Sequence, residues 1–123
     1  MSYDVMLVTD YVKHGKYIIP QAYNFVNHSY GGFHDLNKIF HKRFGRDIWD
    51  YLYYAGNRSI EDTIIPATFQ DSQEEFLKKC IILLAEVLKG EIKVFKEFKE
   101  YAISWILNYI KWILNGYIIV YYQ

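Results

Sequence analysis

The run of residues 91–123 constrains the fold more than any other part of the chain. Its apolar residues recur at alternating steps of three and four, which keeps their side chains on one face of a helix. These residues are Phe95, Phe98, Ala102, Trp105, Tyr109 and Trp112. The opposite positions are mostly polar, so the spacing predicts an amphipathic helix over residues 91–114. Asn115-Gly116 ends it, because glycine adopts the left-handed conformation that closes a helix without steric cost.

The same Asn115-Gly116 pair also supports a different structure. Asn-Gly is a strong hairpin signal, and β-branched and aromatic residues lie on both sides of it. A strand over residues 109–114 would exclude the helix there. We favour the helix because the three-and-four spacing continues unbroken from Phe95. Residues 117–123 are expected to form a C-terminal strand in either case.

The first 26 residues predict a β-hairpin. Residues 3–9 are rich in strand formers, residues 17–19 begin a second strand, and Gly15 lies in the turn between them. Pro20 has no amide hydrogen, so the second strand either lies at an edge or ends there, with residues 23–26 as a continuation after a bulge.

The middle of the chain predicts helices. Residues 27–32 are rich in turn formers, and residues 33–44 form an amphipathic helix that ends at Gly45. A second helix is expected from Asp47 to Gly56, and one more helical turn over residues 59–65. Ser72 and Glu75 have the spacing of a capping box, which predicts a long helix from there to Gly90.

Together these elements predict one α+β domain over residues 1–123. Its parts are a hairpin region at 1–26, short helices at 33–65, an antiparallel helix pair at 72–115 and a strand at 117–123. The hairpin and the last strand are expected to form a small antiparallel sheet, packed against a helical bundle that contains the two long C-terminal helices.

Composition narrows the classes of function. Fourteen basic and fourteen acidic residues cancel, so no overall field attracts nucleic acid. The single cysteine, Cys80, lies in an apolar run and is expected to be buried in a reducing compartment, which favours the cytoplasm. No basic and then apolar leader opens the chain, and a polar stripe interrupts residues 102–122. We therefore expect neither secretion nor a membrane span.

No pattern of catalytic or metal-binding residues is present. The sequence has no Cys-x-x-Cys, no His-x-x-x-His and no Gly-x-Ser-x-Gly. His34 and His41 are seven residues apart on one predicted helix, about 10 Å, too far to share a metal through that helix alone. We therefore predict no catalytic residue, no metal and no cofactor.

A candidate ligand site lies where the helix of residues 33–44 begins. Gly31-Gly32 precedes amides that a helix leaves unpaired, and such a start can cradle an anion. The flanking histidines add positive charge on protonation, and a tyrosine there can stack on a base. The candidate ligand-binding residues are His28, Tyr30, Gly31, Gly32 and His34.

A candidate partner-binding surface combines basic residues with tyrosines. Residues 38–46 are rich in cations, and the aromatic residues of 49–54 cannot all face one core, so Tyr51 or Tyr54 is expected to be exposed. The C-terminal strand adds further tyrosines and is expected to be free to pair across a dimer axis. The candidate residues are Lys38, His41, Lys42, Arg43, Arg46, Tyr51, Tyr54, Tyr121 and Tyr122.

Small size, absent catalytic motifs and thirteen tyrosines fit a stoichiometric binder, since aromatic residues are favoured at interfaces. The leading hypothesis is a non-catalytic inhibitor of a protein partner, of the kind that bacteriophage anti-defence proteins, immunity proteins and antitoxins represent. Homodimers or higher homo-oligomers are also expected. The alternative is a binder of a nucleotide-like anion at Gly31-Gly32. The third is a small enzyme with His28 or His34 as general base.

Overall fold

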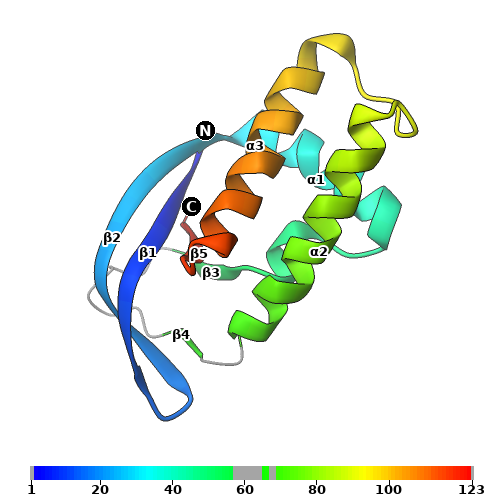
Figure 1. Cartoon of the computed structure of the whole chain (residues 1–123). Coiled ribbons are helices and arrows are strands. Elements are labelled where there is room, and N and C mark those ends of the chain that lie inside the picture. The colour runs from blue at the N-terminus through cyan, green and yellow to red at the C-terminus, as the bar shows by residue number, and fades with distance from the viewer. Residues whose placement is uncertain (1, 57–64, 67–68, 123) are drawn as a thin grey trace.

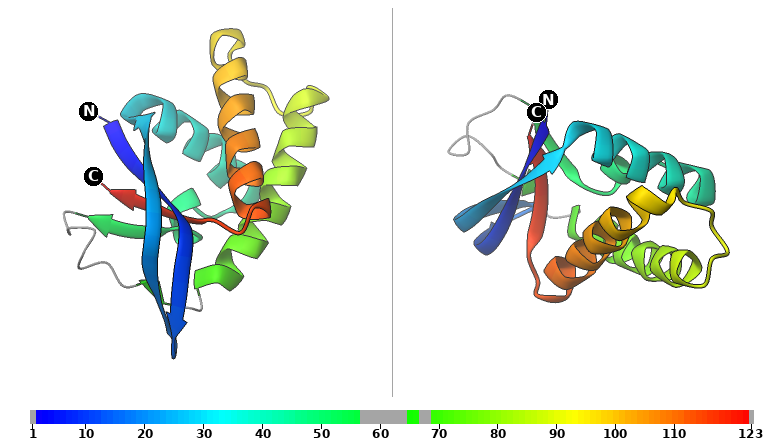
Figure 2. Two further views of the ribbon diagram at one scale, coloured as in Figure 1. Left: turned by 60° about the vertical axis from the view of Figure 1, so that its left-hand side comes forward. Right: turned by 90° about the horizontal axis from the view of Figure 1, so that it is seen from above.

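The structure is a computed structural model that describes residues 2–56, 65–66 and 69–122, with side chains at 4–29, 31–53 and 72–121. It confirms the α+β class. The described strands form one five-stranded sheet in the order β3-β5-β1-β2-β4. Three helices pack on one side of this sheet (Figures 1 and 2). The predicted helical turn at 59–65 lies outside the described residues, except for Ile65, which begins β4 (Ile65–Pro66).

The N-terminal hairpin is confirmed and is longer than expected. β1 (Ser2–His14) pairs antiparallel with β2 (Tyr17–Ser29), and Gly15 has the positive φ of 61° that the turn requires. Pro20 does not end β2. It pairs with Tyr11 of β1, two residues beyond the last described pair of β2 with β4.

The C-terminal strand lies inside the sheet. β5 (Ile118–Tyr122) pairs antiparallel with β1 and parallel with β3 (Tyr53–Gly56). The expectation that this strand is free to pair across a dimer axis is therefore wrong. The helix expected from Asp47 to Gly56 is also wrong, because that segment forms a 3-10 turn, η1 (Ile48–Asp50), and then β3. The parallel pairing with β5 stabilises β3, and local sequence spacing does not reveal such a long-range partner.

Both faces of the central strands are buried, as their continuous apolar sequence requires. On β1, Val5 and Leu7 belong to the large core beneath the helices, whereas Met6 and Val8 belong to a second cluster with Ile18. Because successive side chains of a strand point to opposite faces, this second cluster lies on the other side of the sheet.

The three helices are α1 (Tyr30–Phe44), α2 (Phe69–Leu88) and α3 (Lys96–Leu114). α3 includes residues 109–114, so the helix is confirmed there over the hairpin. It runs antiparallel to α2, as predicted (Figure 1). No helix of the described part combines the length and apolar character that crossing a membrane requires.

The ends of the helices differ from the predicted ends. β2 runs into the predicted turn of residues 27–32 as far as Ser29, and α1 begins at Tyr30, with Ser29 as its cap. α2 begins at Phe69, so Ser72 lies in its first turn and does not cap it. α3 begins at Lys96 and not at residue 91, because Gly90 ends α2 with a φ of 75° and a connection of several residues follows.

Buried polar side chains join the layers. The Gln73 amide donates to the carbonyl of Tyr117 (3.0 Å) and accepts from the amide of Ile119 (2.8 Å), which ties α2 to the start of β5. Asn37 accepts from the amide of Ile48 (2.8 Å) and so ties α1 to η1.

Candidate functional site

The predicted anion site at Gly31-Gly32 is partly occupied by the protein's own groups. The Ser29 hydroxyl accepts from the amide of Gly32 (3.2 Å), which uses one of the donors that an anion would need. The ring of Tyr101, from α3, lies directly against Gly32, where an added Cβ would be only 2.4 Å from it. Gly32 therefore serves the close approach of α1 and α3.

His28 lies in the core beside this contact. Its side chain is fully buried, and its ring stacks on Trp105 with a centroid distance of 3.5 Å and an interplanar angle of 4°. Burial lowers the pKa of His28 from 6.5 to about 3, so the imidazole is neutral at physiological pH. Nδ1 lies 2.7 Å from the Tyr101 hydroxyl.

The hydroxyl of Tyr101 joins His28 to the cap of α1. It lies 3.0 Å from Ser29 Oγ, and one arrangement of protons satisfies the three contacts among Gly32, Ser29, Tyr101 and His28. The amide of Gly32 donates to Ser29, Ser29 donates to Tyr101, and Tyr101 donates to Nδ1 of the neutral His28. The arrangement can lock α1, β2 and α3 together, and it keeps His28 away from solvent.

The other candidate ligand residues do not join His28 in one cavity. His34 is half-buried and lies edge-on to Phe33 and Trp49, with ring centroids 6.1 and 6.4 Å away. Gly31 is exposed, with no atom within 4 Å of an added Cβ. The side chain of Tyr30 lies outside the described residues.

Three of the predicted partner-binding basic residues contact other side chains of the protein. Arg43 Nε donates to both carboxylate oxygens of Glu86 on α2 (2.9 and 2.8 Å). This hydrogen bond raises the pKa of Arg43 and lowers that of Glu86. His41 Nδ1 lies 3.0 Å from Asp47, and the guanidinium of Arg46 lies 4.6 Å from the ring centre of Tyr51.

The remaining two of these basic residues are lysines on one side of α1. Lys38 and Lys42 are exposed and form no ion pair with the described residues. They are four residues apart, so they lie on the same side of α1. Both line hollows between α1 and the connection that leads into α3.

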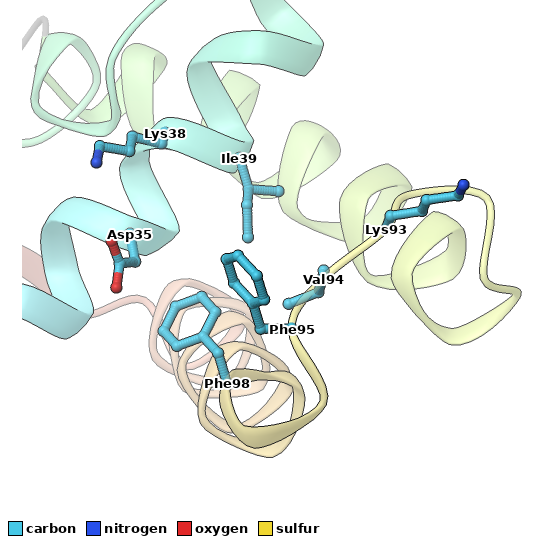
Figure 3. A pocket seen from close by; sticks show the side chains of 7 residues that line it. All are labelled: Asp35, Lys38, Ile39, Lys93, Val94, Phe95 and Phe98. Atoms are coloured by element: carbon cyan, nitrogen blue, oxygen red, sulfur yellow. The ribbon is translucent and has the colours of Figure 1, made fainter.

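These adjoining hollows form the candidate site, which we call the α1–α3 groove. One has a volume of about 420 Å³ and the other about 410 Å³, and Ile39 and Lys93 line both. The groove is lined by Asp35, Lys38, Ile39, Lys42, Arg43, Glu91, Ile92, Lys93, Val94, Phe95 and Phe98. Figure 3 shows Phe95, Phe98 and Ile39 pointing toward one another, with Lys38 on one side and Lys93 on the other.

Phe95 is the most exposed apolar residue of the groove, and it was not assigned to a site from the sequence. Its spacing assigned it to the buried face of a long helix, yet it is 84% exposed. The reason is that α3 begins one residue later, at Lys96, so Phe95 is the N-cap and does not follow the helical face. No residue pattern before Lys96 marks this start, because residues 91–95 contain no Ser, Thr, Asp or Asn.

The tyrosines predicted to be exposed are placed differently. Tyr51 and Tyr121 are buried, at 1% and 2% exposure, so their assignment to an exposed surface is wrong. Tyr51 packs against Phe40 and Phe76, and the hydroxyl of Tyr121 bonds to that of Tyr109. The side chains of Tyr54 and Tyr122 lie outside the described residues. Exposed aromatic residues lie elsewhere, at Tyr17, Tyr23, Phe25, Trp49 and Phe95.

Comparison of the chain with protein-family models, with curated protein sequences and with solved structures gives no match. Among the described residues, the α1–α3 groove combines two adjoining hollows with the most exposed of the large apolar side chains, Phe95.

Proposed function

We propose that the chain is a small non-catalytic protein of the cytoplasm that binds a protein partner and blocks the surface it occupies. Bacteriophage anti-defence proteins, immunity proteins and antitoxins act in this way. One observation carries the proposal. Phe95, a large apolar side chain, is 84% exposed at the edge of a groove whose Lys38 and Lys42 have no ion pair among the described residues.

Exposed aromatic residues and cations next to an apolar hollow are typical of a protein interface. An interface uses a few large side chains as anchors and surrounds them with polar groups. Phe95 has the character of an anchor, and Lys38, Lys42 and Lys93 have that of a rim.

A small-molecule ligand fits the same groove less well. Such sites enclose most of the ligand between walls that are already formed. A wall that includes a side chain as exposed as Phe95 needs a larger partner to cover it. A nucleotide-like anion is less favoured at Gly31-Gly32, since Ser29 accepts from the amide of Gly32 and the ring of Tyr101 lies against the same residue.

The first experiment is a native mass measurement on the tagged chain purified from its own host cells, compared with a Lys38→Glu/Lys42→Glu variant. We expect the wild-type chain to retain a second protein at a defined stoichiometry and the variant to lose it. Arg43 is left unchanged, because its loss would break the bridge to Glu86 and disturb packing between α1 and α2.

A variant with the same change in net charge provides the control. Lys13→Glu/Lys78→Glu alters exposed lysines of β1 and α2 that do not line the groove. Equal partner retention by all three chains would contradict the proposed use of this surface. A bare monomer from wild-type cells would contradict a stable complex.

A further inference from the structure

The α1 wall of the α1–α3 groove is one continuous helical face. Its lining residues are Asp35, Lys38, Ile39, Lys42 and Arg43. They follow the i, i+3, i+4, i+7, i+8 spacing that places side chains in one stripe. At 1.5 Å per residue this stripe is about 12 Å long, which matches about two turns of a second helix.

The described lining of the groove offers an elongated partner segment no strand edge to pair with. One wall is the helix α1, whose interior backbone groups bond within the helix, and the described lining includes no strand residue. An extended peptide would find no strand edge there, so it would gain no ladder of backbone hydrogen bonds by binding. A helix satisfies its backbone internally and needs only side-chain contacts.

The charge of the groove determines which side chains are favoured on either side of the apolar face of such a helix. Lys38, Lys42, Arg43 and Lys93 line it, against the two acids Asp35 and Glu91. Arg43 is already bonded to Glu86, but the three lysines have no ion pair with described residues. Carboxylates on a partner would complement them, and lysines on a partner would be repelled.

The start of α3 adds to this preference. Phe95 is the N-cap of α3, and no side-chain hydrogen bond caps this end. A phenylalanine has no acceptor for the first amides of the helix, where the backbone dipole favours negative charge. Because Phe95 also lines the groove, a carboxylate bound there would lie close to this end.

From these features we infer that the α1–α3 groove binds an amphipathic helix of the partner protein, with large apolar side chains on one face and carboxylates beside them. The apolar side chains pack between Ile39, Phe95 and Phe98, and the carboxylates pair with Lys38, Lys42 and Lys93. This inference rests on the proposed function, and it specifies which element of the partner is bound.

The test uses synthetic helical peptides of about 14 residues, or four turns. The probe carries leucine and tryptophan at i, i+3, i+4 and i+7, with glutamate at the flanking positions. A second peptide has lysine in place of every glutamate, and a third has the composition of the probe in an order that removes the apolar face. Binding to the full chain is followed by fluorescence anisotropy of a labelled peptide.

We expect the acidic probe to bind at least about tenfold more tightly than the lysine peptide, and more weakly as salt rises. The reordered peptide should not bind. In Lys38→Glu/Lys42→Glu the preference between acidic and basic peptides should reverse. Phe95→Ser should weaken binding of the probe at least about tenfold, whereas Leu114→Ser, which alters a residue 69% exposed at the other end of α3, should leave it unchanged.

The inference is overturned if the reordered peptide binds as well as the probe, if the lysine peptide binds equally, or if no peptide binds. If partner retention in cells depends on Lys38 and Lys42 while no peptide binds, the partner presents a different element and the proposed function stands. If retention is also independent of these lysines, both proposals fail.

Discussion

The imidazole of His28 lies flat against the indole of Trp105, with ring centroids 3.5 Å apart and an angle of 4° between the planes. This contact joins the end of β2 to the middle of α3, 77 residues later in the chain. Tyr101, one helical turn before Trp105, bonds to the same imidazole and to the Ser29 cap of α1. The sheet and two of the helices therefore meet at one buried histidine.

The first prediction concerns pH. Burial lowers the pKa of His28 from 6.5 to about 3, so the unfolded chain binds this proton better than the native chain does. Above pH 6.5 the native chain loses no stability to protonation of His28. As pH decreases from there toward 3, the free energy of unfolding falls by about 1.4 kcal/mol per pH unit. Between pH 7 and pH 5 the free energy of unfolding should fall by about 2 kcal/mol more in the wild type than in His28→Phe. Denaturant titrations at the two pH values measure this, and equal losses would contradict a neutral buried His28.

The second prediction concerns the hydroxyl of Tyr101. Tyr101→Phe keeps the ring but removes the group that bridges His28 and Ser29. The free energy of unfolding should fall by about 1–3 kcal/mol, because a buried polar atom loses its partner. Tyr17→Phe, on the exposed hairpin, should change it by less than about 0.5 kcal/mol. A comparable effect of the two substitutions in urea titrations would show that the bridge contributes nothing specific.

The third prediction concerns the adjacent residues Gly31 and Gly32. An alanine Cβ at position 32 would meet the Tyr101 ring at 2.4 Å, whereas one at position 31 meets nothing within 4 Å. Gly31→Ala should stabilise the protein by up to about 1 kcal/mol through helix propensity. Gly32→Ala should destabilise it, since the ring must leave its place between His28 and Ser29. Thermal unfolding of both variants checks the opposite signs, and stabilisation by both would refute the close contact.

The fourth prediction is low reactivity of the only cysteine. Cys80 is 1% exposed, and burial raises the pKa of its thiol. The thiolate is the reactive form, so a thiol reagent at pH 8 should modify the native chain only as fast as the core opens. The urea-unfolded chain, as a control, should react fully at once. Complete modification of the native chain within the mixing time would mean that Cys80 is accessible.

Much of the fold follows from local patterns. The three-and-four spacing from Phe95 onward predicted α3, and strand formers around a Gly15 turn predicted the hairpin. The segment at Tyr53–Gly56 could not be predicted in this way. Its aromatic residues suit a helix or a strand, and the parallel pairing with β5 that decides between them involves residues more than sixty positions away.

The candidate site was predicted in part. The lysines Lys38 and Lys42 were identified from the basic run, and the groove they line is a feature of the described structure. The other wall of the groove, which includes Phe95, was not predicted. Phe95 has the spacing of a buried residue of the helix, and the sequence does not show that it is an exposed N-cap. Tyr51 and Tyr121 were assigned to the surface because the count of aromatic residues gave no information on which of them the sheet and helices cover.

The most direct test of a partner-binding α1–α3 groove is photo-cross-linking in the host cell. The photoreactive residue benzoylphenylalanine replaces Phe95 in one chain and Leu114, which is also exposed but lies at the other end of α3, in another. We predict a one-to-one cross-link to a second protein from position 95 alone, and its loss when Lys38→Glu/Lys42→Glu is added. Cross-links of equal yield from both positions, or a cross-link at 95 that survives the lysine changes, would contradict the account.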